Sequence, residues 1–273
     1  MPSGIQVFAS IRNPDAPSQP AARPRTAIRL LFGEALAGAA GVIGRRLTPL
    51  LRAAGHSVWG TTRSPERQEF LRGLGAHPVL VDVFEAEALA NAVFEAKPEI
   101  IIHQLTDLSE IRDPATRPAA LARNARIRDE GTRNLVAAAR QAGARRLIAQ
   151  SIAWVYAPGP RPYREDDPLD ANADGPQGVS VRGVASLERQ VLAASPAEGL
   201  VLRYGRLYGP GSAADAPLPA PAVHVDAAAY AALRAIDHGE PGLFNIADPS
   251  DAVSTQKAMA ELGWRADFRI EAN

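Results

Sequence analysis

The stretch Gly38-Ala39-Ala40-Gly41-Val42-Ile43-Gly44 decides the fold of this 273-residue chain. It follows an apolar run and precedes an amphipathic run over 42–54. A strand, a glycine-rich turn and a helix are the context in which such glycines bind a dinucleotide. Gly38 permits the tight turn, Gly41 lets the backbone approach a pyrophosphate, and Gly44 lets the helix pack on the strand. The alternative is an Ala- and Gly-rich helix start that binds no ligand.

The helix expected after these glycines supplies the binding groups. Its first N–H groups have no partner within the helix, and its dipole places partial positive charge at the same end. The spacing is G-x-x-G-x-x-G, one residue longer at the front than G-x-G-x-x-G. The residues expected to contact the dinucleotide here are Gly38, Gly41, Val42, Ile43, Gly44 and Arg45.

The composition excludes several classes of partner. Thirty Lys and Arg residues balance thirty Asp and Glu residues, so no overall field attracts nucleic acid or an anionic membrane. The absence of cysteine excludes disulfides and thiol nucleophiles and fits a reducing cytoplasm. No apolar run approaches the roughly 18 residues of a membrane span. No His-Glu-x-x-His motif or carboxylate array occurs, so we expect no metal site. The sequence therefore predicts a cytoplasmic protein with a small-molecule substrate.

The first 27 residues differ in composition from the rest. Prolines interrupt them from Pro2 to Pro24, and few apolar residues there could form a core. We expect residues 1–27 to be a disordered tail. The folded part is then 28–273, a length that suits one large α/β domain.

From Ile28 onward, strand and helix patterns alternate, which predicts an α/β fold with a doubly wound parallel sheet. Strands are expected at 28–37, 56–62, 77–83, 99–103, 145–150, 199–203 and 243–246. Helices are expected at 42–54, 64–73, 85–96, 119–142, 179–194, 226–238 and 255–262. The segments 151–174 and 209–221 are expected to be loops. Gly33 and Glu34 interrupt the first strand, and a carboxylate in a doubly covered strand is costly, so we expect a bulge there.

A series of short motifs occurs in one order along the chain. They are Gly38-x-x-Gly41-x-x-Gly44, Gly131-Thr132-Arg133-Asn134-Leu135, Val155-Tyr156, Glu165-Asp166-Asp167-Pro168-Leu169, Leu202-Arg203-Tyr204, Leu207-Tyr208-Gly209-Pro210-Gly211, His224-Val225-Asp226 and Phe244-Asn245-Ile246. This order resembles the extended branch of the short-chain dehydrogenase/reductase superfamily, of the NAD-dependent epimerase/dehydratase type. The resemblance implies a Rossmann sheet that binds its nucleotide at the C-terminal ends of the strands.

The resemblance also implies a C-terminal substrate lobe, formed mainly from about 155–180 and 204–273. Between Gly211 and Val223 the chain has only a short Ala/Pro segment. Family members that bind nucleotide sugars usually have more chain there. We therefore expect a reduced lobe and a small substrate.

The choice of cofactor can be argued from the end of the second strand. In the NAD form, an acid about 20 residues past the glycines holds the ribose 2′-hydroxyl. Here the strand ends with Arg63 and no acid. Arg63, assisted by Arg45, could pair with a 2′-phosphate, so NADP(H) is favoured over NAD(H). The alternative is that both arginines are solvated. Asp82 matches the family position beside the adenine ring, or caps the following helix, and Val83 joins the expected site.

The resemblance fails at the catalytic positions. It implies a Ser or Thr, a tyrosine, and a lysine four residues after the tyrosine, which lowers the tyrosine pKa. We align on Glu188, which matches the family glutamate four residues after the lysine. The tyrosine position is then Ser180 and the lysine position Val184. The Ser/Thr position, four residues before Tyr156, is Ile152. The alignment therefore predicts that the whole set is absent.

A second observation does not depend on the alignment. No tyrosine or lysine occurs between Arg164 and Glu188, and the chain has only two lysines, Lys97 and Lys257. Lys97 is expected at the end of the sheet opposite the cleft, and Lys257 beyond the last strand. Neither can stand four residues after a tyrosine on the catalytic helix.

Three residues are candidates to replace the lost proton donor. Ser151 lies one residue from the expected position, Tyr163 lies in the proline-rich loop, and Arg128 occupies the place of a family asparagine. Each has a structural alternative, and Arg128 could simply pair with Asp129 or Glu130. The other residues near the expected cleft are favoured as structural: His103, Tyr156, Tyr204 and His224.

The sequence thus predicts an NAD(P)-binding oxidoreductase or isomerase of the epimerase/dehydratase type, acting on a small carbonyl or hydroxyl compound with NADP(H). Function depends on the site rather than on the fold, and this site lacks its expected residues. The alternative is a catalytically inactive NADP(H)-binding regulator or scaffold. Relatives usually pair through their two long helices, so the resemblance implies a homodimer through 119–142 and 179–194.

Overall fold

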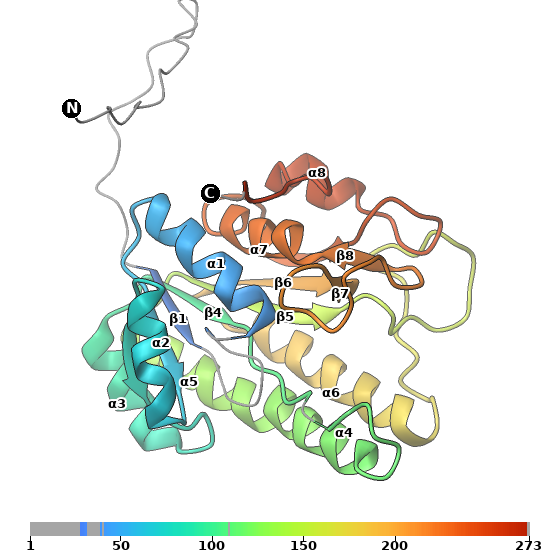
Figure 1. The fold of residues 1–273 in the computed structure, drawn as a ribbon. Helices are drawn as coiled ribbons and strands as arrows, with labels where there is room; N and C mark the ends of the chain where they lie inside the picture. Colours follow the sequence, from blue (N-terminus) through green and yellow to red (C-terminus); the bar gives the residue numbers. More distant parts are fainter. Residues whose placement is uncertain (1–27, 32–38, 40, 109, 272–273) are drawn as a thin grey trace, which may run out of the picture.

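A seven-stranded parallel sheet forms the centre of the molecule (Figure 1). The computed structural model describes residues 28–31, 39, 41–108 and 110–271. Expectations for 1–27, for Gly33 and Glu34, and for Gly38 lie outside the described residues. The strands are β1 (Ile28–Leu31), β2 (Trp59–Thr62), β3 (His77–Leu80), β4 (Ile100–His103), β5 (Arg146–Ile152), β6 (Glu198–Tyr204) and β9 (Gly242–Ile246). Their order across the sheet is β3-β2-β1-β4-β5-β6-β9.

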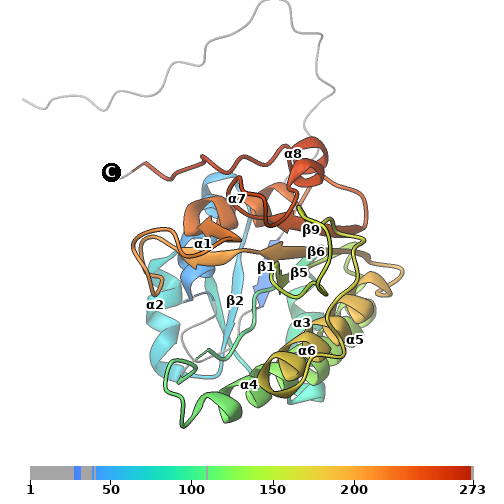
Figure 2. The ribbon, with the colours of Figure 1, turned by 90° about the vertical axis from the view of Figure 1, so that its right-hand side faces the viewer.

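Helices cover both faces of this sheet (Figure 2). One layer holds α1 (Val42–Ala53), α7 (Val225–Arg234) and α8 (Gln256–Leu262), in which α7 contacts both of the others. The opposite layer holds α3 (Ala86–Ala96), α4 (Arg117–Arg126), η2 (Ile127–Gly131), α5 (Thr132–Ala142) and α6 (Gly175–Leu192). The short η1 (Pro65–Arg67) and α2 (Gln68–Gly73) lead into β3. Because both faces are covered, Ile100, Ile101 and Ile102 of β4 are fully buried.

The strand order reverses beside β1, which pairs with β2 on one side and with β4 on the other. In open α/β sheets, ligands bind outside the C-terminal ends of the strands at such a switch point. The helix α1 begins at this edge of the sheet. The topology therefore places its N-terminus at the expected ligand crevice.

The predicted doubly wound sheet is confirmed, but three local features differ from expectation. The helix expected over 119–142 contains a π-helical turn, η2, where the chain gains an extra residue per turn. The helix α6 begins at Gly175, because Pro176 fits the first turn of a helix. Two short strands, β7 (Arg206–Tyr208) and β8 (Ala222–His224), pair in parallel. Their three-residue lengths carry too little alternation for prediction.

One glycine sets the distance between α4 and α6. A Cβ at Gly183 would lie 3.1 Å from the Ala125 Cα and 3.5 Å from the Arg128 Cδ. The first distance is shorter than an ordinary van der Waals contact, so a side chain here would push the helices apart. This approach holds α4 and η2 against the middle of α6.

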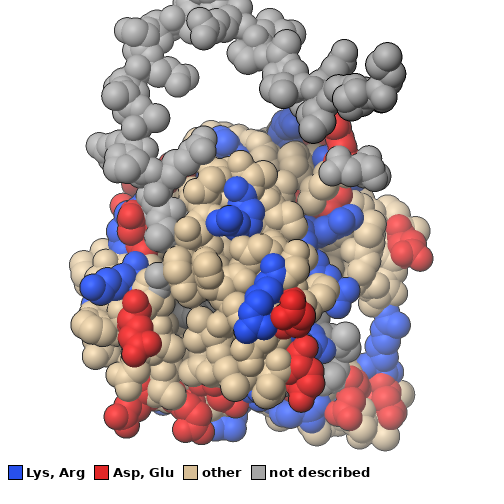
Figure 3. Space-filling view, turned by 60° about the vertical axis from the view of Figure 1, so that its left-hand side comes forward, with Lys and Arg blue, Asp and Glu red and all other residues tan. Residues whose placement is uncertain are grey.

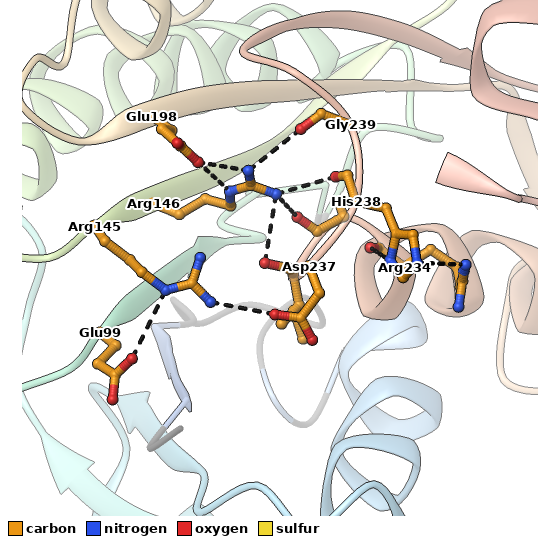
Figure 4. A network of polar contacts seen from close by, with 10 residues as sticks. Glu99, Arg145, Arg146, Glu198, Arg234, Asp237, His238 and Gly239 are labelled. Atoms are coloured by element: carbon orange, nitrogen blue, oxygen red, sulfur yellow. Dashed lines mark hydrogen bonds and ion pairs between the residues drawn. The ribbon is translucent and has the colours of Figure 1, made fainter. Parts of the chain in front are cut away.

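A polar network fixes the end of the sheet at which the strands begin (Figure 4). The Arg146 side chain, only 9% exposed, pairs with Glu198, and its Nε donates to that carboxylate at 2.8 Å. Its Nη1 donates to the carbonyls of Ala235 and His238. These carbonyls follow the last turn of α7 and have no partner within it, so the guanidinium satisfies them. Arg146 therefore ties β5, β6 and α7 together opposite the crevice.

Candidate functional site

A cavity of about 440 Å³ opens at the crevice. It lies where α1, β4, β5 and the loop after β7 converge. Its lining residues include Gly41, Val42, Ile43, Gly44, Arg45, Gln104, Thr106, Gln150, Leu207, Gly211 and Ser212. All the described residues of the glycine motif from Gly41 to Gly44, and Arg45 after them, thus meet one cavity.

The N-terminus of α1 faces this cavity without a capping side chain. Its N-cap, Gly41, is extended (φ −79°, ψ 175°), and no acidic residue occupies the first turn. The first intrahelical bond runs from the Arg45 N–H to the Gly41 carbonyl at 3.0 Å. The N–H groups of Val42, Ile43 and Gly44 therefore lack helical partners. Together with the helix dipole they form an anion site.

A second wall of the cavity carries an unsatisfied amide. Gln104 follows β4 directly and is only 3% exposed. Within the described part of the chain, neither its Oε1 nor its Nε2 makes a hydrogen bond of ordinary geometry, and the buried Tyr204 hydroxyl is the polar group that lies near it. A buried amide without partners costs about 1–3 kcal/mol, so such groups commonly mark a ligand or water that completes them. The unpaired N–H groups, the amide and the space between them fit a dinucleotide.

Two distant loops meet at the wall of the cavity. Arg112 Nη2 donates to the Ala213 carbonyl at 2.8 Å, and both residues line the cavity. Arg123 holds the first loop by bonds of 3.0 Å to Asp107 and 2.9 Å to Glu110. The sequence did not predict this contact between Arg112 and Ala213, because no local pattern links positions that are 101 residues apart.

Charged residues meet where β2 and β3 end. Arg63 Nη1 lies 3.5 Å from Asp82 Oδ2, with about a third of each side chain exposed. The Arg45 guanidinium stands 5.2 Å from the centre of the Phe70 ring. The Val83 carbonyl accepts a bond of 2.9 Å from Asn134 Nδ2. The structure thus joins Arg63 and Asp82, which the sequence analysis assigned separate roles.

Two of the three positions aligned with the catalytic set lie in an apolar cluster. Ile152 and Val184 belong to it together with Val155 and Val181, and all four are buried. Ser180, aligned with the tyrosine, lies one residue before Val181 on α6. This cluster holds no side chain that could gain or lose a proton.

Ser151 turns toward an ion pair rather than toward the cavity. Its Oγ donates to Glu188 Oε1 at 2.8 Å, and Arg203 donates to the same carboxylate through Nε and Nη2. Burial alone would lower the pKa of Arg203, but the bonds and charge of Glu188 outweigh it and raise that pKa. Arg203 Nη1 also donates to the Tyr156 hydroxyl, which donates to Asn245 Oδ1. This Glu188 network joins β5, α6, β6 and β9.

Arg128 is buried between η2 and α6. Only 4% of it is exposed, and Nη1 donates to the Ser180 carbonyl at 3.4 Å. Burial lowers its pKa to about 10, so it stays charged at neutral pH. His103 beside it accepts from the Leu105 N–H at Nδ1, which leaves Nε2 to donate to Thr132 Oγ1. Burial, with the charge of Arg128, lowers the pKa of His103 to about 3, so this imidazole stays neutral.

Tyr163 lies outside the main cavity. Its ring stacks on Tyr156 with centroids 5.0 Å apart, and its hydroxyl accepts from the Gly159 N–H at 3.0 Å. The two lysines lie at the end of the sheet opposite the crevice, where the strands begin. Lys97 caps the end of α3 before β4, and Lys257 Nζ stands 4.6 Å from the centre of the Phe244 ring, beside the first residue of β9.

Three further observations concern the surface charges, the helices and the polar side chains. On the face shown in Figure 3, basic and acidic side chains lie interspersed. Among the described residues, no helix is long and apolar enough to cross a bilayer. The same residues contain no group of three or more His, Asp or Glu side chains arranged to hold a metal ion.

Comparison with known proteins gives relatives by sequence. Residues 35–222 match the NAD dependent epimerase/dehydratase family. A 3-diazoavenalumate denitrifying reductase from a Streptomyces species is 43% identical over 242 residues, covering 81% of this chain and 77% of the relative. A dTDP-4-dehydrorhamnose reductase from Streptomyces griseus is 32% identical over 176 residues, covering 64% of this chain and 49% of that protein.

Solved structures share the fold at lower identity. UDP-glucose 4-epimerase from Thermotoga maritima, solved with UDP-glucose, has a TM-score of 0.70 at 18% identity, covering 89% of this chain and 94% of its own. WbmG from Bordetella bronchiseptica, solved with NAD, has a TM-score of 0.67 at 19% identity, covering 90% and 91%. With the family match spanning more than half of its length, the chain belongs to the NAD dependent epimerase/dehydratase family.

Proposed function

We propose that this protein is an NAD(P)H-dependent reductase that removes the diazo group of a small organic compound as dinitrogen. The reductase that is 43% identical acts, by its name, on a diazo compound. The observation that carries the proposal is the apolar cluster of Ile152, Val155, Val181 and Val184. Reduction of a carbonyl requires a proton as well as a hydride, and this cluster has none to give. Loss of dinitrogen places no such demand on the enzyme.

The atom balance supports this reading. A bound reduced nicotinamide supplies one hydride, so that a diazonium group R–N2⁺ becomes R–H and N2, and the dinucleotide is oxidised. The C–N bond breaks, a C–H bond forms, and no proton is taken from a side chain. The residues of the chain then need only bind, orient and exclude water.

Specific residues are suited to holding the dinucleotide. The N–H groups of Val42, Ile43 and Gly44 face the place of the pyrophosphate, and Gln104 supplies an amide in the same cavity. Asp82 and Val83 are proposed to line the adenosine end. The cleft carries the features of a cofactor site even though the aligned acid and base are missing. This combination favours turnover without enzymatic proton transfer.

The first test is turnover of the purified full chain with NADPH carrying deuterium at C4 of the reduced ring, on either face. An arenediazonium salt should give arene labelled at the former C–N carbon, with one dinitrogen released for each NADPH oxidised. Reactions without enzyme correct for direct reduction of the salt. Lys97→Ala and Lys257→Ala serve as matched controls, because both lysines lie at the end of the sheet opposite the crevice. Both variants should keep at least half of the wild-type rate.

Two other outcomes would overturn the proposal. Steady oxidation of NADPH by small aldehydes or ketones, with no enzymatic reduction of diazonium salts, would indicate a carbonyl reductase in which water or Tyr163 supplies the proton. Tight NADPH binding with no turnover on either panel would indicate a regulator or scaffold, which the apolar cluster would also suit.

We also propose that NADPH binds more tightly than NADH, because Arg63 and Arg45 supply positive charge near the second strand. Asp82 neutralises part of the Arg63 charge, but the ion pair is long, with 3.5 Å between Arg63 Nη1 and Asp82 Oδ2. Arg63→Ala should weaken NADPH binding by roughly 1–3 kcal/mol, the scale of a charged hydrogen bond, and leave NADH nearly unchanged. Titration calorimetry measures both. Arg72→Ala, which removes an exposed arginine paired with Glu69 on α2, is the control. Equal losses for the two cofactors would contradict this role.

The substrate lobe is proposed to be formed mainly from about 155–180 and 204–273, on one Rossmann domain over 28–273. The parallel pairing of β7 with β8 supports part of this assignment, because the short Ala/Pro segment between them must turn back along the pair. So short a connection leaves little chain with which to build a large lobe. A small substrate suits the resulting lobe better than a nucleotide sugar.

A further inference from the structure

Two hollows adjoin each other where α4, α6, the end of β5 and the loop that carries Tyr163 meet. One, of about 420 Å³, lies between α4, α6 and the end of β5, and the other, of about 340 Å³, lies under the loop that carries Tyr163. They share Trp154, Gln177 and Arg206. The larger hollow also contains Ile152 and Ser180 in its wall, which are the positions aligned with the catalytic set. A molecule in this hollow therefore lies against the part of the cleft where the chemistry is expected.

Arg206 lies at the junction of the hollows. Its Nη1 donates to the carbonyls of Pro219 and Ala220 at 3.2 and 3.3 Å. Its guanidinium carbon stands 4.9 Å from the centre of the Trp154 ring. No carboxylate of the described residues pairs with it. The carbonyls and the ring thus fix the plane of the guanidinium, while Nε and Nη2 keep their capacity to donate.

The larger hollow has a mixed lining. Besides Trp154, its wall includes the apolar side chains of Leu121, Ile152, Val155 and Val181 and the polar side chains of Gln177 and Ser180, and Arg206 is its one charged lining residue. Such a lining favours a hydrocarbon body with a single anionic end. A planar guanidinium fork matches a carboxylate better than it matches any neutral group.

The geometry points to a substrate-binding subsite in which Arg206, backed by Trp154, binds the carboxylate of a small organic acid. The hydrocarbon part of the acid lies along the apolar wall toward Ile152 and Ser180. This inference rests on the proposed function, which identifies the reacting end of the substrate. That end would lie toward Ile152 and Ser180. It assigns the far end of the substrate to a specificity-determining residue.

Charge favours a carboxylate over a diphosphate. The charged residues that line the two hollows are Arg161, Asp170 and Arg206. Two arginines and one aspartate give a net charge of +1, which one carboxylate neutralises. A diphosphate would bring at least two negative charges and would face Asp170. The acid is therefore the better match in charge as well as in size.

Binding of an unreactive probe tests the subsite without requiring turnover. In the presence of saturating NADP⁺, calorimetry should show that the wild-type chain binds 4-hydroxycinnamate at least ~10-fold more tightly than its methyl ester. Arg206→Met should weaken acid binding by ~10- to 100-fold and leave ester binding within ~3-fold. Arg206→Lys keeps the charge but loses the planar fork, so it should recover only part of the affinity. Arg182→Met, on the exposed side of α6, is the matched control.

Each contrary result has a distinct meaning. Equal binding of acid and ester, or of neither, by the wild-type chain would overturn the subsite, as would unchanged acid binding in Arg206→Met. Tighter binding of UDP than of the acid, lost in the same variant, would replace the carboxylate by a diphosphate. Circular dichroism and unchanged NADP⁺ affinity establish that each variant is folded. Because no diazonium reduction is measured, failure of the proposed reaction would leave this test intact.

Discussion

Gly41→Val should lower the affinity for both NADPH and NADH by roughly 100-fold or more, about 2.7 kcal/mol. Gly41 has negative φ and extended backbone, so valine fits its conformation without strain. The cost arises instead because Gly41 lines the cavity, where branched methyl groups would fill space next to the unpaired N–H groups of α1. The expected effect is therefore on binding and not on folding.

Titration calorimetry with each cofactor measures this effect, and thermal unfolding without cofactor checks the fold. Gly73→Val is a matched control, because a Cβ at Gly73 meets no atom within 4 Å. If the Gly41 variant and the wild-type chain bound NADPH equally, the N-terminus of α1 would not be the dinucleotide site. The proposed reaction would then lose its cofactor.

Glu188→Ala should reduce the free energy of unfolding by about 3–5 kcal/mol. The Glu188 carboxylate accepts hydrogen bonds from the Ser151 hydroxyl and from Nε and Nη2 of Arg203. The Arg203 side chain is only 2% exposed. Removing it leaves a buried guanidinium without its counter-charge, and removal of one partner is the costly way to break such a pair. A domain has only about 5–15 kcal/mol of net stability, so the loss is a large fraction of the total.

Denaturant unfolding of the variants gives the comparison. Glu130→Ala breaks a pair with Arg126 on a helix surface and should cost about 0–1 kcal/mol. Glu188→Met combined with Arg203→Met removes both charges, so its cost should be smaller than the sum of the two single changes. A loss in Glu188→Ala no larger than that in Glu130→Ala would mean that the network contributes little to stability.

The parts that were predicted from the sequence are those with local causes. The alternation of apolar and helical patterns predicts the parallel sheet, since each strand and helix carries its own signal. The glycine motif predicts the α1 crevice for the same reason, and Gly41 to Arg45 do line one cavity. The preference for NADPH, the homodimer and the catalytic roles of Ser151, Tyr163 and Arg128 stay predictions.

The parts that were missed depend on contacts between distant segments. Glu188 was used only to align the chain, and its partner Arg203 lies on another element. No sequence pattern singled out Arg206, because its orientation depends on contacts with Trp154 and with the carbonyls of Pro219 and Ala220. The π turn at η2 is a change in helical pitch that the apolar periodicity of the segment does not report. In each case the chain sets the residue type, and the tertiary contacts decide its role.

Under the proposed function, the apolar cluster also determines the direction in which the reaction can run. A site without a base cannot withdraw a proton from an alcohol, and dinitrogen, once released, does not return. The oxidised dinucleotide is therefore not regenerated in place but must leave after every cycle. Arg112 and Ala213, which a hydrogen bond of 2.8 Å joins, both line the cavity that the glycine motif meets. Exchange of the dinucleotide after each one-way reaction would therefore take place in a cavity whose wall is built by two segments that are distant in the sequence.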